Sequence, residues 1–198
     1  MLRKRLINAA AVALLTFLST ALSASEKDLI VRLDTSAGII DIKLFPEKAP
    51  ETVENFLAYV DSGFYDGTIF HRVINNFMIQ GGGFTTDGIQ KETRETIKNE
   101  SINKLHNIRG TVAMARLEGP DTASSQFFIN QRSNLKLDWS PGQPGYAVFG
   151  EVIRGMGVVD FIATAETGTK QFQTSTGIIK SFRDVPIDAV IVKSAKRH

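Results

Sequence analysis

The feature that most constrains this chain is a series of short runs rich in β-branched and aromatic residues. Segments rich in glycine, proline, asparagine, aspartate and serine separate these runs, a spacing typical of an all-β sandwich or barrel. Residues 29–45 alternate apolar and polar positions on either side of Ser36-Ala37-Gly38, which predicts a β-hairpin. Six further runs predict one strand each: TIFHRVI (68–74), FMIQGG (77–82), TVAMAR (111–116), SQFFINQ (125–131), YAVFGEVI (146–153) and IDAVIVKSA (187–195).

Two segments have the periodicity of helices instead. In residues 48–65 apolar residues recur at helical spacing, Pro50 stands near the first turn, and Gly63 ends the pattern. Residues 156–165 have a second apolar face. No linker divides the 198 residues. The chain therefore predicts one mainly β domain, a closed eight-stranded antiparallel β-barrel capped by two α-helices.

Residues 1–24 have the form of a secretory signal peptide. MLRKR is a positively charged n-region, and AAAVALLTFL is an apolar run that is short for a membrane span. STALSAS supplies the small residues typical of a cleavage region. Cleavage after Ser23 and cleavage after Ala24 both fit, and an uncleaved N-terminal anchor is the alternative. The folded domain is expected to span residues 25–198. Its predicted location is the periplasm, or the medium if the source has no outer membrane.

Charge and cysteine content narrow the classes of partner. Loss of residues 1–24 removes three basic residues and no acid, so 23 basic residues become 20 against 21 acidic ones, and the net charge changes from +2 to −1. A nearly neutral domain gives no reason to expect a nucleic acid or an anionic membrane as partner. The absence of cysteine excludes disulfides and thiol chemistry. No second apolar segment is long enough to cross a bilayer, so we expect a soluble domain.

Common ligand and catalytic motifs are not found in this sequence. The triple glycine at residues 81–83 belongs to no dinucleotide or P-loop pattern, so a strand bend is favoured over a phosphate cradle. The three histidines have no metal-binding spacing, and TASSQ is no serine-hydrolase elbow. No metal or cofactor is predicted. His71 and Arg72 remain, adjacent on a strand and facing opposite sides; taken alone, each fits a packed or surface role better than a catalytic one.

FHRVINNFMIQGG, followed by MAR, SSQFFIN and GYAVFGEV, resembles the cyclophilin family of peptidyl-prolyl cis-trans isomerases. The resemblance covers residues 29–195 and is greatest to exported bacterial members. It implies an eight-stranded barrel with two capping helices and an active site in a groove on the outer face. Matched by position in the motifs, the groove residues are His71, Arg72, Phe77, Met78, Gln80, Ala115, Arg116, Gln126, Phe128, Leu137 and Tyr146. Phe127 is expected to point into the barrel instead.

These residues suit a reaction that breaks no bond. An Xaa-Pro amide resists rotation through its partial double bond, so no nucleophile, metal or cofactor is required. The predicted catalytic residues are Arg72, Gln80 and His71. Arg72 donates to the twisted amide, Gln80 orients Arg72 or holds a substrate carbonyl, and His71 shapes the pocket. The other groove residues bind substrate, with Ala115 and Arg116 offering backbone groups to the residue before proline.

Three positions depart from the family pattern. Lys136 stands where many cyclophilins have tryptophan, and Trp139, three residues later, is not assumed to replace it. Arg116 and Tyr146 stand where asparagine and histidine are frequent. The resemblance therefore implies weak binding of cyclosporin with catalysis retained.

The predicted function is isomerisation of Xaa-Pro bonds in exported proteins by a monomer whose partners are proline-containing polypeptides. The alternative is a cyclophilin-fold chaperone or proline-peptide binding module with little turnover. A barrel carrying a small ligand inside is disfavoured because bulky residues such as Phe127 and Ile129 should fill the interior.

Overall fold

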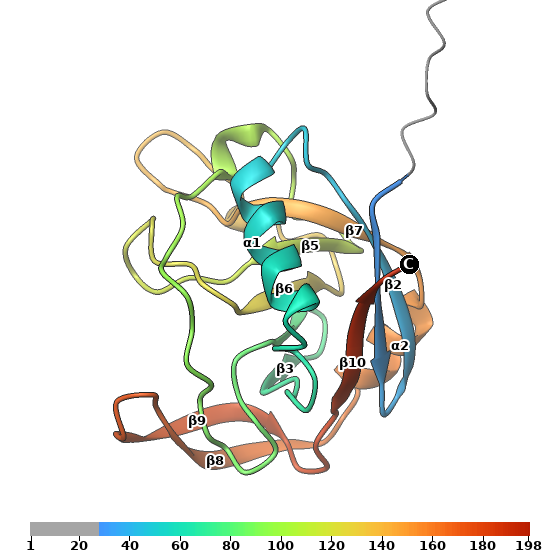
Figure 1. Cartoon of the computed structure of the whole chain (residues 1–198), viewed down its shortest axis with the longest axis vertical. Helices are drawn as coiled ribbons and strands as arrows, with labels where there is room; N and C mark the ends of the chain where they lie inside the picture. The colour runs from blue at the N-terminus through green and yellow to red at the C-terminus, as the bar shows by residue number, and fades with distance from the viewer. Residues whose placement is uncertain (1–27) are drawn as a thin grey trace, which may run out of the picture.

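The computed structural model describes residues 28–198, so the predicted signal peptide and the first residues of the predicted domain lie outside it. Its centre is one antiparallel sheet of eight strands in the order β10-β1-β2-β7-β5-β6-β4-β3 (Figure 1). The strands are β1 (Ile30–Thr35), β2 (Gly38–Leu44), β3 (Arg72–Ile74), β4 (Met78–Gly81), β5 (Thr111–Met114), β6 (Phe127–Asn130), β7 (Val148–Arg154) and β10 (Val192–Arg197). Every predicted run thus contributes a strand, and residues 29–45 form the predicted hairpin β1–β2.

The sheet is curled but open, so the prediction of a closed barrel is wrong. The two outer strands, β3 and β10, form no ladder with each other. The chain just before β3 contacts the start of β10 and the residues before it, through an isolated bridge between Ile69 and Ile191 and neighbouring backbone hydrogen bonds. β3 is three residues long, and another strand, β9 (Ile179–Pro186), lies beside it. The sheet is therefore an open half-barrel, because its last strand is too short and is flanked by a strand of another sheet.

Two α-helices pack on this sheet, as predicted. α1 (Pro50–Asp61) begins at a proline and buries Phe56, whose ring lies 5.5 Å from Phe127 and 5.1 Å from Phe149. α2 (Met156–Ala163) packs beside β2 and follows Gly155, which has a φ of 97°. A Cβ there would collide with the backbone of Ile39. Within residues 28–198, no helix combines the length and the apolar character needed to cross a membrane.

A hairpin that the sequence did not predict extends from the body of the molecule (Figure 1). It consists of β8 (Thr167–Gln173) and β9, which pair only with each other as a sheet. Polar residues stand on both of its faces, so neither strand shows the alternation typical of a half-buried strand. It packs on the rest of the molecule through a buried group that we call the hairpin cluster: Ile69, Phe84, Phe172 and Val185, with Phe182 and Ile191 packed against them.

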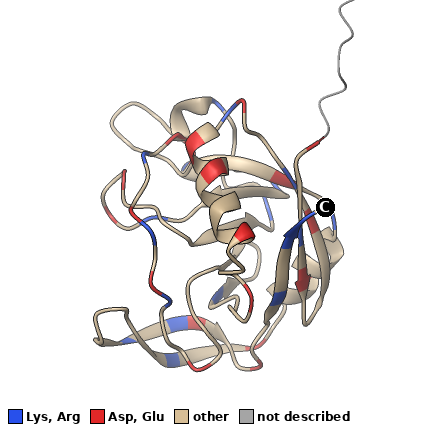
Figure 2. Cartoon of the chain, in the orientation of Figure 1, with Lys and Arg blue, Asp and Glu red and all other residues tan. Residues whose placement is uncertain are grey.

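Acidic and basic positions are both spread along the chain (Figure 2). Acidic positions occur along α1, and basic positions occur on β8, β9 and β10. The most buried carboxylate in an ion pair, Asp41, accepts a hydrogen bond of 2.7 Å from Arg32, and this bond lowers the pKa of Asp41. The mixture of signs agrees with the nearly balanced charge calculated for residues 25–198.

Candidate active site

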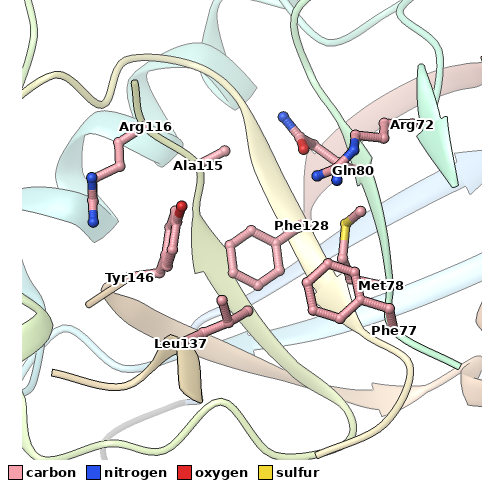
Figure 3. Close-up of a pocket in the computed structure, with 9 residues that line it drawn as sticks. All are labelled: Arg72, Phe77, Met78, Gln80, Ala115, Arg116, Phe128, Leu137 and Tyr146. Carbon is pink, nitrogen blue, oxygen red and sulfur yellow. The ribbon is translucent and has the colours of Figure 1, made fainter. Parts of the chain in front are cut away.

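A hollow of about 290 Å³ opens on the outer face of the sheet (Figure 3). Its walls come from β3, β4, β6, the segment after β5, the segment before β7, and a 3₁₀ helix at Leu135–Leu137. We call it the groove. Nine of the eleven residues predicted for a groove line it: Arg72, Phe77, Met78, Gln80, Ala115, Arg116, Phe128, Leu137 and Tyr146.

The floor of the groove is apolar. Met78 and Phe128 are buried, and they pack in a group with Ala113, Ala115 and Val148 that we call the groove cluster. Phe77, Leu137 and Tyr146 pack against this cluster but stay partly exposed around the opening. Phe127 is fully buried in the main core, while Phe128 faces the groove, as strand alternation predicts. The result is a small apolar hollow with one side open to water.

Two polar side chains stand together at one end of the groove. Arg72 and Gln80 are opposite residues of the antiparallel pair β3–β4, so their side chains share one face. Gln80 Nε2 donates a 2.9 Å hydrogen bond to Gln126 Oε1, which fixes its amide. Arg72 is 42% exposed, and its nearest acidic group is Asp184, with 3.9 Å between Nε and Oδ2. The guanidinium therefore lines the groove and is accessible to a bound molecule.

Arg116 and Tyr146 lie at the opposite end (Figure 3). The Arg116 guanidinium lies 4.6 Å from the centre of the Tyr146 ring and donates to the carbonyls of Pro144 (2.6 Å) and Gly145 (3.2 Å). The side chain thus ties two loops together rather than reaching into the groove. The backbone N–H of Arg116 has no acceptor in the described chain. This end can therefore offer a main-chain donor to an incoming peptide.

His71 and Gln126 do not line the groove. His71 is only 2% exposed and faces the hairpin cluster, with its ring 4.8 Å from Phe84. Burial, assisted by the neighbouring Arg72 cation, lowers the pKa of His71 to about 4, so the imidazole is neutral near pH 7. Its Nδ1 is buried without a hydrogen-bond partner among the described residues. Gln126 lies behind Gln80 and holds its amide in place.

The triple glycine has a packing role next to this site. A Cβ on Gly83 would lie 2.7 Å from the Gln126 side chain, and one on Gly82 would lie 2.9 Å from the Tyr65 ring. Gly82 also has a left-handed φ of 82°. These glycines let the chain bend closely past Gln126, which fits the predicted bend. Within residues 28–198, no group of three or more His, Cys, Asp or Glu side chains could hold a metal ion.

Sequence reasoning missed Asp184, the acidic partner of Arg72. It lies on β9, in a segment whose sequence has no recognisable strand pattern. The feature that distinguishes Asp184 is its left-handed φ of 60°, which only the structure reveals. Lys136 and Trp139 do not line the hollow, and Trp139 is 44% exposed. The tryptophan therefore does not take the place that the motif gives to Lys136.

A curled eight-stranded sheet with two helices, carrying an apolar groove with an arginine at one end, defines a cyclophilin-like protein. Residues 30–184 match the family described as cyclophilin type peptidyl-prolyl cis-trans isomerase/CLD. The chain belongs to this family, and the resemblance seen in the sequence is confirmed.

Two bacterial relatives, both named as peptidyl-prolyl cis-trans isomerases, match this chain over most of their length. The chain is 46% identical over 194 residues to peptidyl-prolyl cis-trans isomerase A of Dickeya dadantii (strain 3937), covering 98% of this chain and 97% of that protein. It is 50% identical over 169 residues to peptidyl-prolyl cis-trans isomerase B of Escherichia coli (strain K12), covering 83% and 97%.

A solved structure is similar as well. The cyclophilin type peptidyl-prolyl cis-trans isomerase of Cryptosporidium parvum, crystallised in the presence of the dipeptide Ala-Pro, superposes with a TM-score of 0.66 at 29% identity. The superposition covers 85% of this chain and 98% of that one.

Proposed function

We propose that this chain isomerises Xaa-Pro peptide bonds of exported proteins while they fold, and that the reaction takes place in the groove. The observation that carries this proposal is the accessible guanidinium of Arg72 beside a hollow floored by Met78 and Phe128. The hollow has the size and the apolar lining for a proline ring. The names of the bacterial relatives and the Ala-Pro dipeptide of the Cryptosporidium crystal support proline-containing chains as substrates.

The groove can lower the rotational barrier without covalent chemistry. The barrier of about 18–20 kcal/mol comes from delocalisation of the nitrogen lone pair, and the twisted amide is less charge-separated than the planar one. A dry pocket therefore disfavours the twisted state less than water does. Arg72 donates to the nitrogen only when its lone pair has localised, so this contact stabilises the transition state selectively.

The size of this contribution can be bounded. A charge-assisted hydrogen bond is worth roughly 1.5–3 kcal/mol, and about 1.4 kcal/mol corresponds to a tenfold change in rate. Arg72 alone thus accounts for about ten- to a hundredfold. The rest comes from desolvation and from holding the peptide on both sides of proline, with Gln80 fixing one end and the free N–H of Arg116 the other.

Export follows from residues 1–24, which have the charge, length and small-residue pattern of a signal peptide. We infer a periplasmic monomer that acts on unfolded clients and binds cyclosporin weakly, because Lys136 stands at the usual tryptophan position. Expression of the full chain in a bacterium with two membranes, followed by osmotic shock and intact-mass measurement, tests this. We expect the shock fluid to hold a protein beginning at Ala24 or Ser25. Retention of residues 1–24 on a membrane-bound chain would overturn cleavage, and a chain that stays in the cytosol would overturn export.

Isomerisation itself is measured by exchange NMR on a short proline peptide, with the wild type and Arg72→Ala. We expect the wild type to accelerate cis–trans exchange and the variant to be strongly impaired. Binding of the peptide by the wild type without faster exchange would instead support the alternative, a proline-peptide binding module.

A further inference from the structure

A second hollow lies next to the groove, near Arg72. Its volume is also about 290 Å³, and its walls come from the end of β3, the end of α2 and the base of the β8–β9 hairpin: Val73, Ile74, Asn75, Ala163, Thr164, Ala165, Thr167 and Asp184. Two features join it to the groove. Ile74 also packs against the groove cluster, and Asp184 also pairs with Arg72. We call it the exit hollow.

The strand that carries Asp184 is bulged at this point. Gly168 of β8 pairs with Val185, and Lys170 pairs with Phe182, so one residue of β8 faces Arg183 and Asp184 together. In a regular strand, Phe182 and Val185, three positions apart, would point to opposite faces, whereas with the bulge both pack in the hairpin cluster. Asp184 takes the left-handed conformation, with φ of 60°, and its side chain reaches Arg72. The bulge thus directs a carboxylate to the junction of the two hollows.

Asp184 is only loosely engaged there. The 3.9 Å between its Oδ2 and Arg72 Nε is too long for a hydrogen bond, and no hydrogen bond to its side chain occurs among residues 28–198. Its side chain is 43% exposed. It therefore keeps the capacity to accept hydrogen bonds from a cation that enters the exit hollow.

The rest of the exit hollow also suits a cation. No lysine or arginine lines it, and its other polar groups are the hydroxyls of Thr164 and Thr167 and the Asn75 amide. The carboxyl end of α2, which carries partial negative charge, is part of its wall. Val73, Ile74 and two alanines supply apolar surface for an aliphatic stem. A charged tip on an apolar stem is the chemistry of a lysine or arginine side chain.

The path of a bound peptide leads to this hollow. A chain that pairs with the Arg116 N–H and places proline over Phe128 reaches Arg72 at the opposite end (Figure 3). An extended chain advances about 3.3–3.6 Å per residue, so the next two or three residues pass Arg72 and reach Asp184. We infer that the exit hollow is a subsite for a basic side chain within three residues after the proline, with Asp184 as its acceptor. The inference rests on the proposed function, which sets the direction of the peptide.

The test uses peptides that differ only at the second residue after proline, where lysine, norleucine or glutamate is placed. Norleucine keeps the aliphatic stem without the charge, so the ratio of kcat/KM for lysine to norleucine isolates the charge. At low salt we expect a ratio of about three and a lower rate for glutamate, as for a partly exposed ion pair. In Asp184→Asn, which tolerates the left-handed conformation, the ratio should fall to one. Asp188→Asn removes the same charge from an exposed site outside the hollow and should keep it.

Two further comparisons separate a direct contact with Asp184 from an indirect effect through Arg72. Asp184→Asn can also shift Arg72, but that effect changes the rates for all peptides equally and leaves the ratio unchanged. Thr164→Lys brings a positive charge to the hollow while keeping both Arg72 and Asp184, and it should make glutamate preferred over lysine. A ratio of one in the wild type, or a preference that survives Asp184→Asn, overturns the inference. If the wild type does not accelerate cis–trans exchange of the norleucine peptide, that result counts against the proposed function instead.

Discussion

The groove cluster and the hairpin cluster lie on either side of the chain at residues 69–74, and both are built around aromatic rings. Around the groove, Phe77, Leu137 and Tyr146 remain partly exposed next to a hollow. In the hairpin cluster Phe84 and Phe172 are almost completely buried, with ring centres 5.0 Å apart. His71 and Arg72 are adjacent but point to different clusters. Aromatic content alone therefore does not identify a binding site, and the unfilled space beside the rings does.

The largest expected effect is a difference in stability between variants of the two clusters. Phe172→Ala should lower the free energy of unfolding by about 3–5 kcal/mol because it leaves a cavity among packed rings. Phe77→Ala, at the partly exposed edge of the groove, should cost only about 1 kcal/mol of stability but reduce kcat/KM strongly. Urea unfolding and exchange NMR on the folded fraction measure both quantities. Equal stability losses, or a folded Phe172→Ala protein with an impaired rate, would remove the distinction between the clusters.

His71, which packs on the hairpin cluster, should make the stability of the protein depend on pH. In the unfolded chain a histidine titrates near 6.5, whereas burial lowers the pKa of His71 to about 4 in the folded protein. Between these values the unfolded state binds the extra proton, so stability falls as the pH drops from about 6.5 to about 4. The full loss amounts to about 3 kcal/mol and is absent above pH 7. Urea unfolding curves from pH 4 to pH 8 measure it.

The control for this effect is His71→Phe, which keeps an aromatic ring beside Phe84 and cannot titrate. Subtracting its stability profile from that of the wild type isolates His71 from all other groups. We expect the difference to decline below pH 6.5 and His71→Phe to retain most of its isomerase activity. A flat difference would mean that the imidazole is not buried as described, and loss of catalysis in a folded variant would give His71 a direct role in the reaction.

Replacement of Arg72 should reduce the rate of isomerisation and leave the stability almost unchanged. Arg72→Ala is expected to lower kcat/KM by about ten- to a hundredfold, because it removes the donor to the twisted amide. Its side chain is 42% exposed and its ion pair is loose, so stability should change by less than about 0.5 kcal/mol. Arg154→Ala, which removes an exposed arginine 3.8 Å from Asp41 and outside the groove, is the matched control and should leave the rate unchanged. Comparable rate losses in both variants would point to a general charge effect rather than to a contact in the groove.

The groove was accessible to sequence reasoning because its residues lie in short motifs that can each be recognised in the sequence. Arg72, Met78 and Gln80 lie within one short hairpin, and strand alternation separates Phe127 from Phe128. The motif order placed nine of the eleven candidates around one hollow. His71 was harder to assign, since its neighbour in the sequence faces the groove while its own ring packs on Phe84, which lies after the next strand.

The remaining features depend on contacts between distant segments. Whether an eight-stranded sheet closes is decided by how β3 meets β10, and neither strand carries that information. The β8–β9 hairpin has polar residues on both faces, so its strands have no buried side to read from the pattern. Asp184 reaches Arg72 only through the bulge in that hairpin. These features follow from tertiary packing rather than from local residue choice.

The smallest expected effect concerns the rim of the groove. Lys136 lies on the 3₁₀ helix next to Leu137, which lines the hollow, and its side chain is exposed. A tryptophan there would add a ring beside the apolar floor, so Lys136→Trp should raise the affinity for cyclosporin about five- to tenfold. Because Lys136 does not line the hollow, the isomerisation rate should change less than twofold. Titration calorimetry measures the affinity for cyclosporin, and exchange NMR measures the isomerisation rate. Lys136→Met, which removes the charge without adding a ring, should bind cyclosporin with the affinity of the wild type; an equal gain in both variants would assign the gain to loss of the lysine charge instead of to the added ring.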